Sequence, residues 1–274
     1  MPTEPELLAR ELAAAYSSRQ IIPIPPSGRD AGFDLTAAYA VEAALVRIRR
    51  AGGAGTAGRK VGFANRALWR KFKLDTVLWA HMYDDTIHQA AGGAASLAVA
   101  GMVSPKIEPE IIFRLRGAPR GDLADPVAVL AAVEGFALGF EIVDSVYQDW
   151  KFQPADFVAA FGLHAALIVG AFTPLESPMI PALAEQLATV TVRLLKDGAL
   201  IAGGAGANVL KSPALCLGEL AAGLARQPNA DPLAAGELIA TGAMTDNQFI
   251  APGESWTVSV DGLDLADLTL RTTA

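Results

Sequence analysis

The segment "SPKIEPEIIFRL" (residues 104–115) places two carboxylates, Glu108 and Glu110, in a run that otherwise alternates like a β-strand. Side chains two residues apart share one face of a strand. One face therefore carries Ile107, Pro109, Ile111, Phe113 and Leu115, and the opposite face carries Glu108, Glu110 and Arg114. Because two like charges on one face repel each other, this pattern requires either water on an outer face or a positive partner on an inner one.

A third acid, Glu141, lies in "GFALGFEIVDSV" (residues 135–146), where its apolar neighbours predict a buried carboxylate. A buried, unpartnered carboxylate either destabilises the fold or takes up a proton. A divalent cation shared by Glu108, Glu110 and Glu141 would remove this cost, and Mg²⁺ and Mn²⁺ prefer oxygen ligands. The alternative is that the first two acids lie on a solvated face and that Glu141 pairs with an arginine.

Most of the chain beyond residue 57 is patterned as short strands. They are "RKVGFA" (59–64), "PKIEPEIIFRL" (105–115), "ATVTVRLLKDGALIAGGAG" (188–206), "ELIATGAM" (237–244) and "SWTVSVDGLDLADLTLR" (255–271). Asp197-Gly198 predicts a tight hairpin turn. Helices are expected at residues 126–140 and 212–227. Since helices do not alternate regularly with strands, the pattern predicts an α+β fold rather than a parallel doubly wound sheet.

The first part of the chain is patterned as helices. Residues 3–19 predict an amphipathic helix, which the prolines of "IIPIPPSGRDAG" (21–32) end. Asp34 or Thr36 can cap a second helix, "TAAYAVEAALVRIRR". The glycines of "GGAGTAG" (52–58) have the spacing of a dinucleotide fingerprint, but they follow a helix and precede a strand, so a flexible connection is favoured. We expect an N-terminal helical region at 1–56 and a β-rich catalytic domain at 57–274.

Composition limits the class of protein. The 274 residues are 52% hydrophobic and 19% charged, which suits a substantial buried core. A net charge of −7 argues against nucleic acid as a partner. No stretch approaches the roughly 20 apolar residues that span a bilayer. The single cysteine, Cys216, permits no internal disulfide. These features predict a soluble cytoplasmic protein that binds neither nucleic acid nor membrane.

The order of several motifs resembles a known family. Arg59 and Lys60 in "GRKVGF" and Thr241 and Gly242 in "ELIATGAM" flank "PKIEPEI", "FEIVDS" and "QDW". This order resembles the hydratase/decarboxylase branch of the fumarylacetoacetate hydrolase superfamily, which includes 2-oxopent-4-enoate hydratases and 4-oxalocrotonate decarboxylases. The resemblance covers nearly the full chain. Its most specific piece is Glu-x-Glu followed later by a lone glutamate in an apolar segment.

The resemblance implies a mixed β-sandwich roll, like the C-terminal fold of fumarylacetoacetate hydrolase, with an N-terminal helical region and a homo-oligomeric assembly. It also implies a Mg²⁺ or Mn²⁺ site held by Glu108, Glu110 and Glu141. Lys60 would be the acid/base, and a buried position beside Arg59 and the cation would lower its pKa. Otherwise Lys60 is a surface lysine. The residues expected at the substrate are Arg59, Lys151, Thr241 and Gly242.

Two segments depart from the family pattern. "LWAHM" (78–82) places His81 where the hydratases have an aspartate, and "AAFGLHA" (159–165) offers His164 in place of a polar "DNASCG"-like segment. Because imidazole exchanges protons near neutral pH, both histidines are candidate catalytic residues. A structural role is the alternative for each.

The leading hypothesis is a metal-dependent lyase that adds water to a 2-hydroxy-dienoate or similar 2-oxo-enoic acid, as a 2-keto-4-pentenoate hydratase does. Two other enzyme readings stay open: decarboxylation of a 2-oxo diacid and hydrolysis of a carbon–carbon bond in a β-diketone-like substrate. Decarboxylation needs a cation for the second carboxylate, which Lys151, Arg66 or Lys211 could supply. The non-enzyme alternative is an inactive partner subunit.

Overall fold

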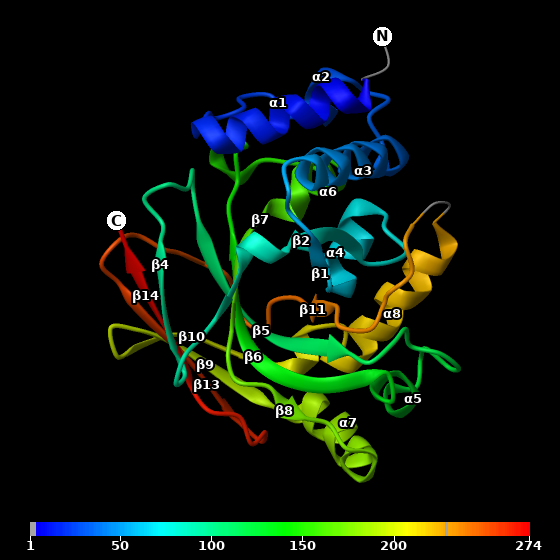
Figure 1. The fold of residues 1–274 in the computed structure, drawn as a ribbon, viewed down its shortest axis with the longest axis vertical. Coiled ribbons are helices and arrows are strands. Elements are labelled where there is room, and N and C mark those ends of the chain that lie inside the picture. Colours follow the sequence, from blue (N-terminus) through cyan, green and yellow to red (C-terminus); the bar gives the residue numbers. More distant parts are fainter. Residues whose placement is uncertain (1–3, 228–229) are drawn as a thin grey trace.

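The computed structural model describes residues 4–227 and 230–274 (Figure 1). Residues 1–3, the start of the predicted helical region, lie outside this description. The α-helices are α1 (Pro5–Ser18), α2 (Pro26–Arg29), α3 (Leu35–Ala51), α4 (Arg66–Phe72), α5 (Pro126–Leu130), α6 (Pro154–Ala159), α7 (Ile180–Thr189) and α8 (Pro213–Arg226). Short 3₁₀ turns are η1 (Asp84–Thr86), η2 (Gln148–Trp150), η3 (Phe161–Leu163), η4 (Ser177–Met179) and η5 (Gly206–Asn208). Among the described helices, none combines the length and the apolar character needed to cross a membrane.

The strands form two mixed sheets. The larger one has the order β2-β1-β11-β5-β6-β7-β3, with β12 added to β5 and β8 to β6. Its strands are β1 (Thr56–Gly62), β2 (Leu78–Tyr83), β3 (Ile87–Gln89), β5 (Lys106–Leu115), β6 (Val133–Val143), β7 (His164–Val169), β8 (Thr173–Pro174), β11 (Leu238–Ala240) and β12 (Gln248–Phe249). The smaller sheet has the order β10-β9-β13-β14-β4. Its strands are β4 (Ala94–Ala98), β9 (Thr191–Lys196), β10 (Ala199–Ala205), β13 (Ser255–Asp261) and β14 (Leu268–Thr273).

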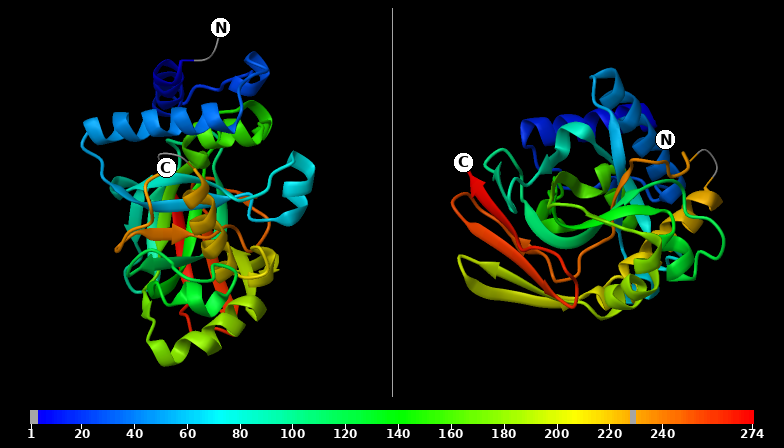
Figure 2. Two further views of the ribbon diagram at one scale, coloured as in Figure 1. Left: turned by 90° about the vertical axis from the view of Figure 1, so that its right-hand side faces the viewer. Right: turned by 60° about the horizontal axis from the view of Figure 1, so that its bottom comes forward.

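Both sheets curl about a shared interior (Figure 2). The predicted apolar face of β5, with Ile107, Ile111 and Phe113, is fully buried in the main core together with Leu194 and Val258 of the smaller sheet. The predicted α+β roll of mixed sheets is confirmed. Because the apolar face of β5 packs in this core, the acidic face of β5 lies on the opposite side of the larger sheet.

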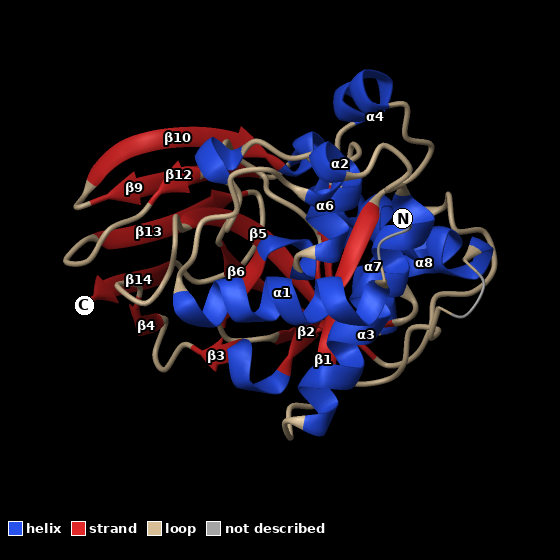
Figure 3. Cartoon of the chain, turned by 90° about the horizontal axis from the view of Figure 1, so that it is seen from above, coloured by secondary structure: helices blue, strands red, loops and turns tan. Residues whose placement is uncertain are grey.

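The N-terminal helices pack on the roll through α6. α1 and α3 cross above the larger sheet (Figure 3) and share a second hydrophobic cluster with α6. Asp34 caps α3, as its position in the sequence suggested, by accepting a hydrogen bond from Ala37 N at 2.9 Å. The buried Asp156 of α6 accepts hydrogen bonds from Ser27 N at 2.8 Å and Ser27 Oγ at 2.5 Å, which ties α2 to the roll. α1 and α3 thus share a hydrophobic core with α6, which belongs to the β-rich part of the chain. The predicted boundary between a helical region (1–56) and a catalytic domain (57–274) stays a prediction.

The helix expected over residues 126–140 is wrong for most of its length. α5 ends at Leu130, and from Val133 the chain continues as strand β6 between β5 and β7. An apolar run fits a buried helix or a buried strand equally well, so the neighbouring strands decide. Gly139 also favours the strand, because a Cβ there would lie 2.4 Å from Ile112 Cγ1 of β5.

The predicted hairpin is present between β9 and β10. Asp197 and Gly198 have φ values of +50° and +82°. Positive φ at both central residues is typical of the tight turn that matches the twist of paired strands. Local sequence therefore specified this part of the smaller sheet.

Candidate active site

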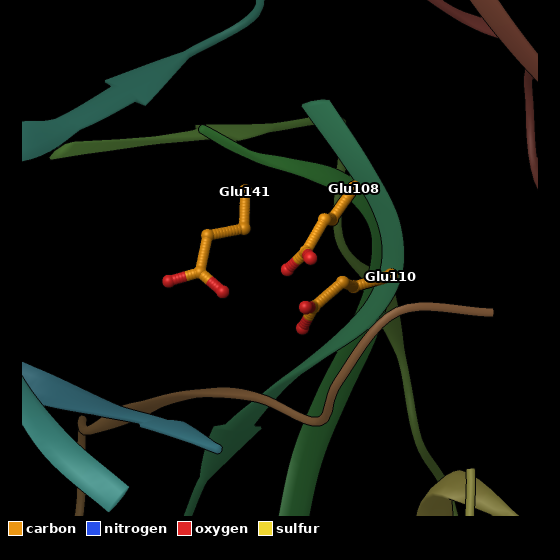
Figure 4. A group of neighbouring side chains, drawn as sticks. All are labelled: Glu108, Glu110 and Glu141. Atoms are coloured by element: carbon orange, nitrogen blue, oxygen red, sulfur yellow. The ribbon is translucent and has the colours of Figure 1, made fainter. Parts of the chain in front are cut away.

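Three carboxylates meet on the acidic face of β5. Glu108 and Glu110 lie on the same side of this strand, and Glu141 is opposite Glu108 in the register of β6. One oxygen of each carboxylate lies within 4.8 Å of the others. Figure 4 shows the three groups pointing toward one another. The acids that alternate through β5 therefore lie on an inner face of the protein.

Lys60 of β1 brings a positive charge to this cluster. Its side chain is buried, and Nζ lies 2.8 Å from Glu141 Oε2. The two opposite charges form a buried ion pair. Glu110 Oε1 is buried without a hydrogen-bond partner. The three carboxylates thus outnumber the ammonium group that faces them.

The pKa values of the acids reflect this crowding. Burial, followed by the charges of Glu141 and Glu108, raises the pKa of Glu110 well above its ordinary value. Burial likewise raises the pKa of Glu108, although Lys60 opposes it. For Glu141, burial alone would raise the pKa, but Lys60 and His164 together hold it below the ordinary value. A divalent cation would relieve the repulsion and give Glu110 Oε1 a partner, so the residues fit Mg²⁺ or Mn²⁺.

The three carboxylates shift the pKa of Lys60 in the direction opposite to the one expected for a buried lysine beside Arg59 and a bound cation. Burial lowers its pKa as expected, but Glu141, Glu108 and Glu110 outweigh burial, so its pKa is raised above the ordinary value. Arg59 does not contribute, because successive residues of β1 point to opposite faces. Lys60 is therefore held as an ammonium ion among the carboxylates.

Backbone and amide groups fix the two acids of β5. Gly242 N donates to Glu110 Oε2 at 2.7 Å, and Asn247 Nδ2 donates to Glu108 Oε1 at 3.0 Å. Gly242 has a φ of +107°, a conformation that favours glycine. Gly242, expected near the substrate, thus lies at the acids and also lines the cavity beside them.

His164 lies directly behind Glu141. Its Nδ1 is 2.9 Å from Glu141 Oε1, and its Nε2 is 2.9 Å from Thr86 Oγ1. Because a carboxylate only accepts hydrogen bonds, Nδ1 carries a proton. The ring is buried and is not among the residues that line the cavity. His164 is therefore placed to hold Glu141 and not to touch a substrate.

The structure does not bring His81 or Arg59 to the acids. The two residues are neighbours in the register of β1 and β2, on the face of the sheet opposite Lys60. Arg59 Nη1 lies 3.2 Å from Glu237 Oε1, and His81 Nδ1 lies 2.6 Å from Glu42 Oε1 of α3. The expected roles of His81 in catalysis and of Arg59 in substrate binding therefore have no support in this geometry.

Thr241 and Lys151 occupy different surroundings from those expected. Thr241 is fully buried, and its Oγ1 donates to Ile111 O at 2.8 Å instead of facing the cavity. Lys151 lies at the cavity rim, where its side chain is 80% exposed and pairs with Asp149 at 3.2 Å. Of the residues predicted to bind substrate, Gly242 and Lys151 line the cavity.

A turn with left-handed backbone conformation packs closely against the side chain of Lys60. Phe161, Gly162 and Leu163 have φ values of +57°, +57° and +59°. A Cβ at Gly162 would lie only 2.7 Å from Lys60 Cδ and 2.9 Å from Ala80 Cβ. Left-handed conformations cost roughly 1–2 kcal/mol for residues other than glycine. This turn belongs to the segment in which the sequence departs from the family pattern.

Glu108 lines a cavity of about 1320 Å³, and Glu110 and Glu141 are fully buried next to Glu108. Lys60, Glu108 and Gly242 line one part of the cavity. Sequence reasoning missed five aromatic residues that line another part of it, beside polar residues such as Asn65, Gln148 and Asn208. They are Phe63, Phe72, Trp150, Phe152 and Phe157. The density of rings in "DWKFQPADF" (residues 149–157) was the available signal, but this segment was considered only for its polar groups.

The chain is similar to known enzymes over most of its length. No family model matches the chain. It is 31% identical over 233 residues to a 4-oxalocrotonate decarboxylase of Pseudomonas sp, with 85% of each chain covered. It is 30% identical over 233 residues to a 2-hydroxyhexa-2,4-dienoate hydratase of Comamonas testosteroni, with 82% of each covered. The solved 4-oxalocrotonate decarboxylase of Pseudomonas putida G7, complexed with magnesium and adipate, superposes with a TM-score of 0.85 at 26% identity, covering 98% of this chain and 97% of that one.

Similarity to these hydratases and decarboxylases over most of the chain, with the same overall fold, defines an enzyme of the hydratase and decarboxylase type. The chain belongs to the hydratase/decarboxylase branch of the fumarylacetoacetate hydrolase superfamily. The resemblance drawn from the ordered motifs is confirmed.

Proposed function

We propose that this protein is a Mg²⁺- or Mn²⁺-dependent hydro-lyase that adds water to a 2-hydroxy-dienoate or 2-oxo-enoic acid, like a 2-keto-4-pentenoate hydratase. The observation that carries the proposal is the meeting of Glu108, Glu110 and Glu141 within 4.8 Å at a cavity that also contains Lys60. Glu108, Glu110 and Glu141 would hold the cation. When bound, the cation supplies Lewis-acid stabilisation of negative charge on the substrate oxygens.

Lys60 would carry out the proton transfers of the reaction. Ketonisation of the dienol needs a proton at the far carbon, and conjugate addition of water needs a second proton transfer. Lys60 Nζ, held as an ammonium ion beside Glu141, faces the cavity and is placed to give and take back a proton. His164 fixes the other oxygen of Glu141 and so acts as a positioning residue.

Decarboxylation of a 2-oxo diacid is the second candidate, because the relative with 31% identity is named for it. A second carboxylate would require a cation at the far end of the cavity. Of the three residues suggested from the sequence, Arg66 and Lys211 do not line the cavity, and Lys151 is exposed and paired with Asp149. This arrangement favours hydration.

The test is turnover by the purified protein. 2-Hydroxypenta-2,4-dienoate should lose its conjugated absorbance with Mg²⁺ present, at a kcat on the order of 1–10³ s⁻¹. Chelation should stop the reaction, and added Mg²⁺ should restore it. Release of CO₂ from 4-oxalocrotonate without hydration would identify a decarboxylase instead. No turnover of either acid in the presence of metal would favour the inactive-subunit alternative.

We also propose that the protein is a cytoplasmic homo-oligomer that acts on a small molecule. The only cysteine, Cys216, is buried as a free thiol, which suits a reducing compartment. β10 is an edge strand of the smaller sheet, and its Leu200 and Ile201 are 63% and 44% exposed. An apolar edge of this kind favours pairing with another copy.

Sedimentation velocity at low micromolar concentration should therefore show no major monomer. Leu200→Lys should shift the protein toward smaller species, because a charge on the edge strand opposes strand pairing. The control is Leu7→Lys, which also introduces a lysine in place of an exposed leucine. Leu7 is 68% exposed and lies on helix α1, away from any strand edge. A wild-type protein that sediments as a clean monomer would contradict the proposed assembly.

A further inference from the structure

Five aromatic side chains form an unbroken series along the cavity, here called the aromatic wall: Phe72, Phe63, Phe157, Phe152 and Trp150. The ring centroids of Phe72 and Phe63 are 5.6 Å apart, and those of Phe63 and Phe157 are 5.2 Å apart. Phe157 and Phe152 stack at 6.5 Å, and Phe152 lies 6.3 Å from Trp150. Each ring therefore contacts the next, although the five residues come from two separate stretches of the chain, 63–72 and 150–157.

The middle of the aromatic wall lies beside Lys60. Lys60 Nζ lies 5.1 Å from the centre of the Phe157 ring. That ring rests on β1 where Gly62 has no side chain, since a Cβ there would lie 2.2 Å from Phe157 Cζ. From Phe157 the wall continues through Phe152 and Trp150, which are only partly buried. A substrate held at the acids would thus extend along the rings.

The cavity is much larger than a five-carbon acid needs. Its volume of about 1320 Å³ exceeds the roughly 300–1,000 Å³ typical of pockets for drug-sized ligands. Leu68, Val143 and Leu163 add aliphatic surface to the lining. The space beyond the acids is therefore suited to a sizeable apolar substituent.

The charged residues that line the cavity indicate whether this substituent carries a charge. Among the described residues that line the cavity, the cations other than Lys60 are Lys71 and Lys151. Lys71 Nζ lies over the Phe72 ring at 4.9 Å, and both lysines are exposed. A second carboxylate would meet rings and solvated ammonium groups instead of a buried cation. The cavity therefore favours a substrate whose end remote from the acids is uncharged.

We infer that the substrate is a 2-oxo or 2-hydroxy-dienoic acid whose end remote from the carboxylate bears an uncharged, aryl-sized group. The inference rests on the proposed function and specifies its substrate class. Flat rings gain from edge-to-face and offset contacts with an aromatic surface, in addition to the area that they bury. The series of five side chains presents such a surface without interruption.

Binding of three acids that share one head group tests this inference. 2-Oxobutanoate, 2-oxoadipate and 2-oxo-4-phenylbutanoate would be titrated into the protein by calorimetry with saturating Mg²⁺. The phenyl acid should bind at least about tenfold more tightly than 2-oxobutanoate, and 2-oxoadipate should gain nothing. Equal affinities for the phenyl and short acids, or tightest binding of 2-oxoadipate, would overturn the inference while leaving the proposed function intact.

Failure of all three acids to bind in a metal-dependent way would overturn the proposed function itself. Phe152→Leu should bring the affinity ratio of the phenyl acid to 2-oxobutanoate close to one. Phe172→Leu is the matched control, because Phe172 packs over Arg114 away from the cavity and should keep the ratio. A ratio that survives Phe152→Leu in a folded variant would count against the aromatic wall. Melting curves would establish that both variants are folded.

Discussion

Glu110→Gln should raise the melting temperature of the metal-free protein and remove the stabilisation that Mg²⁺ gives to the wild type. Glu110 is fully buried, its Oε1 has no hydrogen-bond partner, and its pKa is raised well above the ordinary 4.5. An acid with a raised folded-state pKa favours folding at low pH, and this contribution is lost as the pH rises above about 4.5 through the folded-state value. At neutral pH the charge is therefore a cost that glutamine removes.

The same substitution should abolish metal-dependent turnover. A ligand that binds only the folded state stabilises it by about 2.7 kcal/mol when present at 100 times its Kd. Loss of a residue that merely orients a ligand lowers metal affinity about 10–100-fold, so loss of a ligand should lower it at least as much. Thermal melts with and without Mg²⁺ measure both effects.

Glu237→Gln is the control for this experiment. Glu237 also has a pKa raised by burial, but it pairs with Arg59 on the other face of the sheet. This variant should lose stability, because the buried Arg59 would be left without its charged partner, and Mg²⁺ should raise its melting temperature as much as that of the wild type. An unchanged Mg²⁺ shift in Glu110→Gln would show that the three acids do not form the cation site.

Lys60→Met should lower kcat by about 10²–10⁴-fold, the usual contribution of a general acid or base. Methionine preserves much of the length and apolar packing of the lysine stem and removes the ammonium group that pairs with Glu141. Because the three carboxylates remain, Mg²⁺ should still stabilise this variant. Steady-state kinetics with saturating Mg²⁺ would separate the fall in kcat from any change in KM.

Lys196→Met supplies the comparison, because Lys196 also pairs with a glutamate, Glu254, but in the smaller sheet. Its kcat should match that of the wild type. A fall of less than tenfold in Lys60→Met would assign the proton transfers to another group and leave Lys60 with a role in charge balance alone.

Local patterning was sufficient for much of the fold and for the acids. The alternation around Glu108 and Glu110 fixed their common face, and the apolar neighbours of Glu141 indicated its burial. The strand β6 was not predictable, because its apolar run suits a helix equally well and only pairing with β5 and β7 decides between them.

The positions of the polar residues away from the acids depended on the tertiary structure. Alternation along β1 implies that Arg59 and Lys60 face opposite ways, and applying it would have removed Arg59 from the site. His81 lies on strand β2 and its partner, Glu42, lies 39 residues earlier on helix α3, and no local signal connects them. The aromatic wall likewise forms only when two distant segments, residues 63–72 and 150–157, meet.

The turn at Gly162 has a consequence for the mobility of Lys60. The close approach of Gly162 to Lys60 Cδ and the ring of Phe157 beside Nζ confine a side chain that would otherwise sample many rotamers. Ordering a lysine side chain costs up to about 2 kcal/mol of conformational entropy. Here that entropy is lost when the chain folds, so the ammonium group does not lose it again in each reaction cycle. A segment without hydrogen-bonding side chains can in this way contribute to rate through the stiffness that it imposes on its neighbour.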